Sequence, residues 1–368
     1  MKRLALIAVF VASVALTAQE APKSTLIDSA QLLLDLKTLS ADDMQGRQIN
    51  TAGGEKARGY VVERFKASGI AAFGSSYEAP FTFAGGGGAE RRGVNVIGHI
   101  AGSAQFPRYI VVSAHYDHIG VRSGQVFNGA DDNASGTAAL FAIAKYFAAH
   151  KPKNTIVFAA WDGEEVGLRG ARAFVAKPPV AASLLALNLN ADMIGREASD
   201  RLYVVGGALQ PFLKPHIQAI AAKAPVKLIM GYENPGDREN WTQQSDHYAF
   251  IEAKIPALYF GVEDFEHHHK ATDDYETMTY GFYVRAVETL LQAVQYFDQH
   301  LDAVDAARRD GNRHSPISGL PIPRLPVAQE LLEKGVHLPE PVEPAVVSQR
   351  VVHIVGLDDQ LVVDVVLT

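Results

Sequence analysis

The sequence predicts an α/β protein, a three-layer sandwich whose mixed, mainly parallel central sheet is flanked by helices. Short apolar runs recur along the chain, each closed by polar or glycine residues and separated by stretches with apolar positions at helical spacing. Such alternation of buried strands with helices is typical of parallel sheets. We expect strands at NVIGHI (95–100), YIVVSAH (109–115), TIVFAAW (155–161), LLALNLNAD (184–192), LYVVGG (202–207) and PALYFGV (256–262).

The helices and the domain limits follow from the same pattern. Apolar spacing predicts helices over 25–38, within 39–70, over 135–150 and over 280–300. We therefore expect a helical N-terminal extension at 19–90, packed on a main domain at 91–302. A proline-rich linker is expected at 303–345, and a strand-like tail at 346–368 that turns at positions 358–359.

The first eighteen residues and the composition limit the expected cellular location of the protein and the kinds of partner it binds. MKRLALIAVFVASVALTA (1–18) has two basic residues, an apolar stretch and small residues near its end, as in a signal peptide. The chain has no cysteine and a net charge of -7, and no later run is apolar enough to span a bilayer. This pattern predicts a bacterial periplasmic or secreted protein with no nucleic acid partner and no stable membrane insertion after cleavage. It leaves the oligomeric state open.

Polar clusters come directly after several of the expected strands. His115 and Asp117 close one strand, Glu164 and Glu165 follow the next, and Asp192 ends a third. Acidic groups at the end of a buried strand need a compensating cation or solvent. Ligands of α/β sheets bind beyond the carboxyl ends of parallel strands, so these clusters are expected to form one site.

Five segments together carry a metal-ligand pattern, although each alone has an ordinary structural explanation. The segments are HYDH (115–118), NGADDNASG (128–136), EE (164–165), NADMIG (190–195) and EHHHKATDDYETM (266–278). A solvated loop or a helix cap explains any single one of them. Jointly they place histidines and carboxylates on separate elements, which is a suitable ligand mixture for zinc.

Six segments in order resemble the co-catalytic zinc aminopeptidases, whose zinc exopeptidase fold is shared by glutaminyl cyclases, glutamate carboxypeptidases and the transferrin receptor ectodomain. The resemblance covers residues 39–300 and rests on SAHYDH, NGADDNASG, WDGEEVGLRGA, NLNADMIG, SDHYAF and HHHKATDD. It implies a zinc-dependent exopeptidase, with residues 91–302 as its catalytic domain. Peptides would be its substrates, and two zinc ions per chain its cofactors.

The resemblance also implies a ligand set. His115 and Asp192 would hold one zinc, Glu165 and His269 the other, and Asp131 would bridge them. The peptide between Asp131 and Asp132 would be cis. His267 and His268 would be bystanders.

The catalytic roles are implied in the same way. Asp117 would orient His115, and Glu164 would act as general base on a metal-bridging hydroxide. In SDHYAF (245–250), Asp246 and His247 would lie at the site, with His247 donating to the tetrahedral intermediate. Capping of a helix by Ser245 or Asp246 is the alternative. Two aromatic residues of the preceding loop, Tyr232 and Trp241, are candidates to line a side-chain pocket.

Three alternatives to an exported aminopeptidase remain. A glutaminyl-peptide cyclotransferase would use nearly the same ligands with one zinc, whereas the intact HYD and NADMIG segments favour two metals and hydrolysis. A carboxypeptidase would need a basic clamp for the terminal carboxylate, which the sequence does not locate. A receptor-like binding module would be expected to have lost ligands, but all expected positions are filled.

Overall fold

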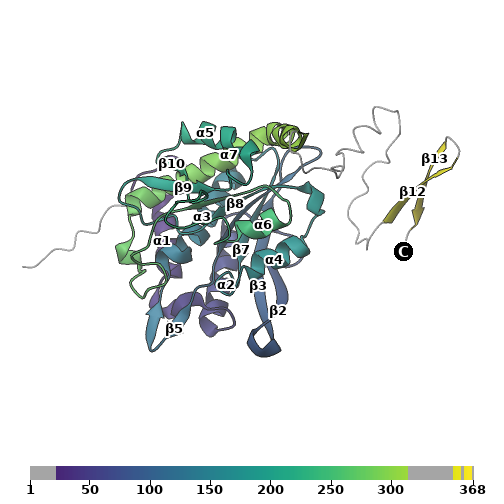
Figure 1. Cartoon of the computed structure of the whole chain (residues 1–368). Coiled ribbons are helices and arrows are strands. Elements are labelled where there is room, and N and C mark those ends of the chain that lie inside the picture. Colours follow the sequence, from purple (N-terminus) through teal and green to yellow (C-terminus); the bar gives the residue numbers. More distant parts are fainter. Residues whose placement is uncertain (1–21, 314–350, 358–359, 367–368) are drawn as a thin grey trace, which may run out of the picture. The chain divides into compact units, whose positions relative to one another are not determined.

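Nine strands form one mixed sheet at the centre of the computed structural model, which describes residues 22–313, 351–357 and 360–366 (Figure 1). The sheet order is β1-β3-β7-β4-β8-β11-β9-β10, with β2 paired to β3. Its strands are β1 (Ala71–Ala72), β2 (Glu78–Ala84), β3 (Glu90–Ile100), β4 (Tyr109–His115), β7 (Thr155–Trp161), β8 (Leu185–Ala191), β9 (Arg201–Val205), β10 (Lys227–Met230) and β11 (Ala257–Gly261).

The four central strands β7, β4, β8 and β11 run parallel to one another. β3 is antiparallel to β7, and β9 is antiparallel to β11, so the outer strands make the sheet mixed. This arrangement confirms the predicted fold class. The carboxyl ends of the four central strands consequently lie at one edge, where the chain leaves the sheet through its polar clusters.

Helices cover both faces of the sheet (Figure 1). They are α1 (Ser29–Leu39), α2 (Ala52–Ala67), α3 (Gly136–Ala149), α4 (Arg169–Ala176), α5 (Lys214–Ala221), α6 (His247–Glu252) and α7 (Tyr280–Arg313). Alternate strand residues explain the two layers. Ile156 and Phe158 of β7 belong to the core shared with α1, α2, α3 and α7, whereas Val157 and Ala159 belong to the core shared with α4 and α6.

The N-terminal segment is more than a helical extension. Besides α1 and α2 it contributes β1 and β2, which pair antiparallel with β3 and so belong to the main sheet. Side-chain caps define its helices: Asp28 accepts the backbone N–H of Gln31 at 3.0 Å, and Thr51 accepts that of Gly54 at 3.2 Å.

The C-terminal end of the main domain extends beyond the expected limit. α7 continues to Arg313, although the linker was expected to begin at 303; the chain divides into two units at 314/315. In the second unit, β12 (Val351–Leu357) and β13 (Gln360–Val366) pair antiparallel. The expected turn at 358–359 and positions 314–345 of the linker lie outside the described residues.

The short pair β5 (Gly120–Arg122) and β6 (Gln125–Phe127) forms a separate ribbon between β4 and α3. The proposed signal segment, 1–18, lies outside the described residues. Within the described part of the chain, no helix combines the length and apolar character needed to span a bilayer.

Candidate metal centre

The polar clusters meet at the carboxyl edge of the parallel strands. His115 is the last residue of β4, Glu165 follows β7, and Asp192 follows β8. His269 lies in the segment after β11, and Asp132 lies in the loop that enters α3. Together with His118 and His268, these side chains form three overlapping groups whose ligand atoms could hold a metal ion, and Asp132 belongs to all three.

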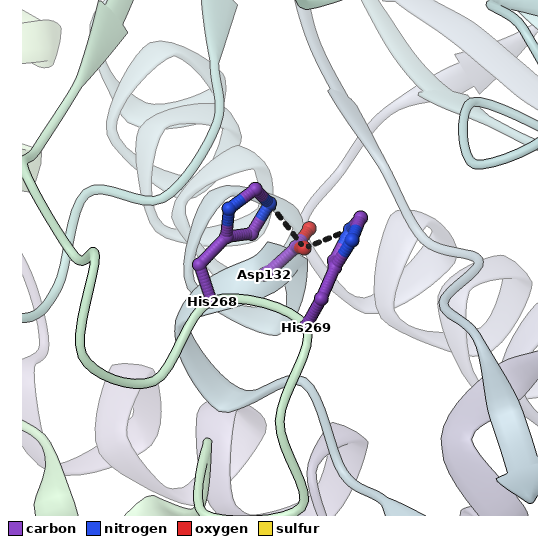
Figure 2. A group of neighbouring side chains, drawn as sticks. All are labelled: Asp132, His268 and His269. Carbon is purple, nitrogen blue, oxygen red and sulfur yellow. Dashed lines mark ion pairs between the residues drawn. The ribbon is translucent and has the colours of Figure 1, made fainter. Parts of the chain in front are cut away.

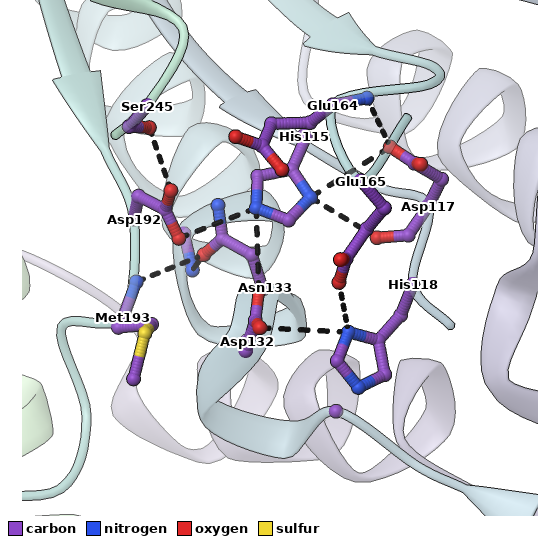
Figure 3. A network of polar contacts seen from close by, with 12 residues as sticks. His115, Asp117, His118, Asp132, Asn133, Glu164, Glu165, Asp192, Met193 and Ser245 are labelled. Carbon is purple, nitrogen blue, oxygen red and sulfur yellow. Dashed lines mark hydrogen bonds and ion pairs between the residues drawn. The ribbon is translucent and has the colours of Figure 1, made fainter. Parts of the chain in front are cut away.

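The first group is built around one oxygen of Asp132 (Figure 3). The Nε2 atom of His115 lies 3.3 Å from Asp132 Oδ1 and 3.2 Å from Asp192 Oδ1. All three side chains are buried. Burial alone would lower the pKa of His115, but Asp192, Asp117 and Asp132 raise it well above its ordinary value.

The other two groups surround the other oxygen of the same carboxylate and together form the second ligand group. His269 Nε2 lies 3.3 Å from Asp132 Oδ2 and 3.1 Å from Glu165 Oε2. His268 Nε2 is 3.6 Å from Asp132 Oδ2 (Figure 2), and His118 Nδ1 is 3.6 Å from that atom (Figure 3). Asp132 therefore presents one oxygen to each group.

The distances between these ligand atoms fit a metal ion with tetrahedral coordination. Two ligand atoms at the usual zinc distances and a tetrahedral angle are about 3.3–3.5 Å apart. The pairs that join His115 to Asp132 and Asp192, and His269 to Asp132, lie 3.2–3.3 Å apart. These distances lie at the upper end of the N–H···O hydrogen-bond range of about 2.7–3.2 Å or just beyond it. The donor set also suits zinc, because it mixes imidazole and carboxylate.

Two atoms of the second group lack hydrogen-bond partners, and this also indicates a bound cation. His118 Nδ1 lies 2.6 Å from Glu165 Oε1, yet neither atom has a partner in hydrogen-bond geometry and both are buried. Buried polar groups normally have such a partner, so atoms of this kind call for another explanation. A cation between these side chains provides one.

Asp131 is not the shared carboxylate, and this corrects the sequence-based assignment by one position. Its Oδ1 accepts the backbone N–H of Gly195 at 2.7 Å, and it belongs to none of the three groups. The cis peptide likewise lies between Asp132 and Asn133, not between Asp131 and Asp132. Of these two aspartates, Asp132 is the one whose carboxylate oxygens lie beside His115 and His269.

A glycine and two backbone hydrogen bonds fix the loop that carries Asp132. Gly129 has a φ of 56°, and a Cβ at this position would lie 2.1 Å from the carbonyl oxygen of Asp132, so only glycine fits. The carboxylate of Asp273 accepts the backbone N–H groups of Asp131 and Asp132 at 2.9 and 3.0 Å. Arg196 Nη2 in turn lies 2.7 Å from Asp273 Oδ1.

Neighbouring residues orient the ligands themselves. The backbone carbonyl of Asp117 lies 3.0 Å from His115 Nδ1, while its carboxylate oxygen Oδ1 is 3.7 Å from that atom. Asp117 Oδ1 also accepts the backbone N–H of Glu164 at 3.1 Å. Ser245 Oγ donates to Asp192 Oδ2 at 2.6 Å (Figure 3). Outer contacts of this kind fix the orientation of metal ligands.

Glu164 lines the same cavity as the candidate ligands. This cavity has a volume of about 460 Å³, and His115, Asp132, Glu165 and Asp192 contribute to its wall. Burial raises the pKa of Glu164 well above its ordinary value, and nearby carboxylates including Asp192 and Glu165 add to this rise. Glu164 belongs to none of the three metal-ligand groups.

His247 does not line the cavity, which differs from its expected place at the site. It begins α6, is fully buried, and stacks on Tyr259 with ring centroids 5.1 Å apart. Burial lowers its pKa to about 3. Tyr259, which lines the cavity, takes the position facing the ligands. Asp246 is also buried and makes no side-chain cap for α6.

Of the two aromatic candidates, one lines the cavity and the other does not. Trp241 lines the cavity, whereas Tyr232 lies behind it, stacked on the indole at a centroid distance of 3.7 Å. His267 points elsewhere, with Nδ1 lying 3.0 Å from Thr272 Oγ1. His268, expected to be a bystander, contacts Asp132 instead.

Sequence reasoning thus missed four residues of the centre: Asp132, His118, His268 and Ser245. A signal existed for each, because every one belongs to a segment already singled out. Spacing alone could not decide between neighbours, since the choice depends on which side chain the loop turns inward.

A sequence model of Peptidase family M28 matches residues 95–294. A probable zinc metalloprotease of Pyrenophora tritici-repentis is 27% identical over 231 residues, which cover 53% of this chain and 47% of that protein. A glutamate carboxypeptidase 2 homolog of Caenorhabditis elegans is 41% identical over 87 residues, covering 22% and 10%. The chain spans about half the length of the first of these relatives, and less of the second. Neither relative is bacterial, so the expected bacterial source is not borne out.

Solved structures share the fold. BSAP, a zinc aminopeptidase from Bacillus subtilis, superposes with a TM-score of 0.60 at 16% identity, covering 74% of this chain and 96% of that one. Porphyromonas gingivalis glutaminyl cyclase gives a TM-score of 0.62 at 18% identity, covering 74% and 99%. Likeness at this identity establishes the zinc exopeptidase fold, while the family model covers more than half of the chain. This protein therefore belongs to Peptidase family M28.

Proposed function

We propose that the protein is an exported, zinc-dependent aminopeptidase that removes N-terminal residues from peptides and binds two zinc ions per chain. The observation that carries this proposal is the position of Asp132, whose two carboxylate oxygens face two separate sets of histidine and carboxylate ligands. Such an arrangement suits a pair of metal ions that share one ligand.

The two sets divide the ligands between them. His115 and Asp192 would hold one ion with Asp132 Oδ1, and His269 and Glu165 would hold the other with Asp132 Oδ2. When bound, zinc supplies Lewis acidity toward a carbonyl oxygen and lowers the pKa of water. The protein contributes the fixed ligand geometry, with Asp117 and Ser245 orienting His115 and Asp192.

Glu164 would act as the general base. Its carboxylate lies in the wall of the cavity beside the ligands without belonging to a ligand group, so it can accept a proton from water and return it to the leaving amine. The hydrogen bond from its backbone N–H to Asp117 fixes its place on the loop after β7.

The lining of the cavity favours action at the amino end of a peptide. Among the described residues that line it, none is lysine or arginine, so no basic clamp for a terminal carboxylate is present there. Glu164 and the carboxylates of the candidate ligands instead make the buried end of the cavity acidic, which suits a free ammonium group.

Glutaminyl cyclisation is the second candidate, because a glutaminyl cyclase shares the fold. That activity would use one zinc, and the doubled ligand arrangement around Asp132 favours the two-zinc hydrolase. Export rests on the signal-like residues 1–18. Peptides would be the only partners, with neither nucleic acid nor membrane insertion involved.

The test is hydrolysis of a panel of aminoacyl-p-nitroanilides by the mature protein, with zinc content per chain measured on the same sample. We expect activity with about two zinc ions, and a decrease in kcat of about 10²–10⁴ in Glu164→Gln with zinc retained. Glu266→Gln, which removes an exposed acid near His268 and His269, is the matched control and should leave kcat unchanged.

Other outcomes would contradict the proposal. One zinc per chain with cyclisation of an N-terminal glutamine peptide would make the cyclase assignment correct. A zinc-free protein without activity would support a binding module. Full activity of Glu164→Gln would remove the general base from the mechanism.

A further inference from the structure

The cavity holds more negative charge than two zinc ions would neutralise. Besides Asp132, Glu165 and Asp192, it is lined by Glu164, Glu239 and Asp264. The carboxylate of Asp264 contacts the guanidinium of Arg196 and is therefore compensated. Glu164 and Glu239 remain: neither belongs to a metal-ligand group, and no arginine is among the described residues that line the cavity with them. The guanidinium of Arg238, the chain neighbour of Glu239, lies over the ring of Phe265, 3.8 Å from its centroid.

Glu239 is held on an aromatic wall. Its Oε2 accepts the indole N–H of Trp241 at 3.2 Å, and Trp241 is stacked on Tyr232. Tyr203 and Tyr259 pack edge-on or tilted against the same indole, with centroids 5.9 and 6.0 Å away. These ring contacts hold the indole in place, and its N–H group orients the Glu239 carboxylate.

Glu239 lies toward the solvent end of the cavity. It is exposed, whereas His115, Asp132 and Asp192 are buried. A peptide bond cleaved at the metal centre lies at the buried end, together with the α-amino group beside it. A long side chain that extended from there toward solvent would meet Trp241 and Glu239, which line the same cavity.

We propose that Glu239 selects peptides whose N-terminal residue carries a cationic side chain of the lysine or arginine type. The aliphatic stem would pack along Trp241, which lines the cavity, and the charged head would pair with the Glu239 carboxylate. A cation near the Trp241 ring gains further attraction from its π face. This inference rests on the proposed aminopeptidase function and names its substrate class.

The test compares lysyl- and norleucyl-p-nitroanilide, which differ by the side-chain ammonium alone. For the zinc-loaded wild type we expect kcat/KM to be about fivefold higher for the lysyl substrate, as for a partly exposed ion pair. Glu239→Gln should bring the ratio close to one by lowering the lysyl value while leaving the norleucyl value unchanged. Glu239→Lys should reverse the order and favour a glutamyl substrate over the lysyl one. Glu266→Gln is the control of equal charge change and should keep the wild-type ratio.

Each contrary result has a distinct meaning. A wild-type ratio near one, or one that Glu239→Gln leaves unchanged, overturns the inference while the aminopeptidase stands. Equal decreases for both substrates in Glu239→Gln overturn it as well, because Glu239 would then bind the α-ammonium group that both share. Absence of hydrolysis for every N-terminal residue in wild type contradicts the proposed function itself.

Discussion

The buried guanidinium of Arg47 donates from Nη2 to the backbone carbonyl of Gly129 at 2.9 Å. The same group also donates to the carbonyls of Leu39, Tyr116 and Asn128. Burial lowers the pKa of Arg47, but only to about 10, so it stays charged at neutral pH. One side chain thus joins the N-terminal segment to the loop that carries the shared carboxylate.

Replacing Arg47 by methionine should destabilise the protein by at least about 3 kcal/mol, because several buried carbonyls lose a charged donor. Arg47→Lys should recover only part of this loss, since an ammonium cannot reach the same set of acceptors. Thermal unfolding of the zinc-loaded protein measures the effect, with an expected decrease in Tm of about 10 °C for Arg47→Met. Exposed Arg122→Met is the matched control, and an equal decrease there would refute the assignment.

Asp132 and Asp131 should behave differently despite their adjacency. Asp132→Asn should lower the zinc content and abolish activity, because a neutral amide is a poor ligand for both sets. Asp131→Asn keeps an oxygen that can accept the Gly195 N–H, so zinc should be retained. The number of zinc ions per chain after dialysis, measured for both variants, tests this prediction. Loss of metal in Asp131→Asn with retention in Asp132→Asn would restore the assignment made from sequence.

Zinc affinity should decrease as the pH falls. The hydrogen bonds of Asp132 and Glu165 raise the pKa of His269 to about 10 in the absence of metal, so this ligand is protonated at neutral pH. A histidine must lose its proton to bind zinc. Below the raised pKa the apparent affinity should drop about tenfold per pH unit from this residue.

Competition with a chromophoric chelator at pH 6, 7 and 8, corrected for the chelator's own protonation, measures this dependence. His269→Asn should bind zinc more weakly at pH 8 and show a smaller slope. A slope of zero in wild type would contradict protonation of His269 in the apoprotein.

Ser245 should affect zinc binding only through its hydrogen bond to Asp192. Its hydroxyl donates to Asp192 Oδ2 and accepts from the side chain of Asn190, so Ser245→Ala frees the carboxylate to rotate. A loss of this kind typically lowers metal affinity or activity by about 10–100-fold. The measured quantity is the zinc dissociation constant at fixed pH. Exposed Ser123→Ala serves as control, and equal affinities of Ser245→Ala and wild type would refute the role.

Removal of zinc should lower the thermal stability, because metal binds the folded chain and its ligands come from separate strands. At a free zinc concentration 100 times its dissociation constant, the expected gain in unfolding free energy is about 2.7 kcal/mol. Differential scanning fluorimetry with a chelator, followed by added zinc or magnesium, tests this. Zinc should restore the Tm and magnesium should not, since magnesium prefers oxygen ligands. An unchanged Tm after chelation would count against a zinc site.

The sequence by itself determined the class of fold and the edge where the site forms. Apolar runs such as 109–115 and 155–161 coincide with β4 and β7, because strands buried on both faces must be apolar throughout. Since the central strands are parallel, the residues after them, including Glu165 and Asp192, had to meet at one edge.

Tertiary structure decided which neighbour points inward. Asp131 and Asp132 have the same chemistry and stand in the same loop, so no periodicity distinguishes them; contacts from Arg47 and Asp273, distant in sequence, set the loop and turn Asp132 to the ligands. The same holds for His247, whose motif lies at the centre but whose ring packs behind Tyr259. Local sequence specifies which groups are available, whereas long-range hydrogen bonds and packing specify the direction in which each one points.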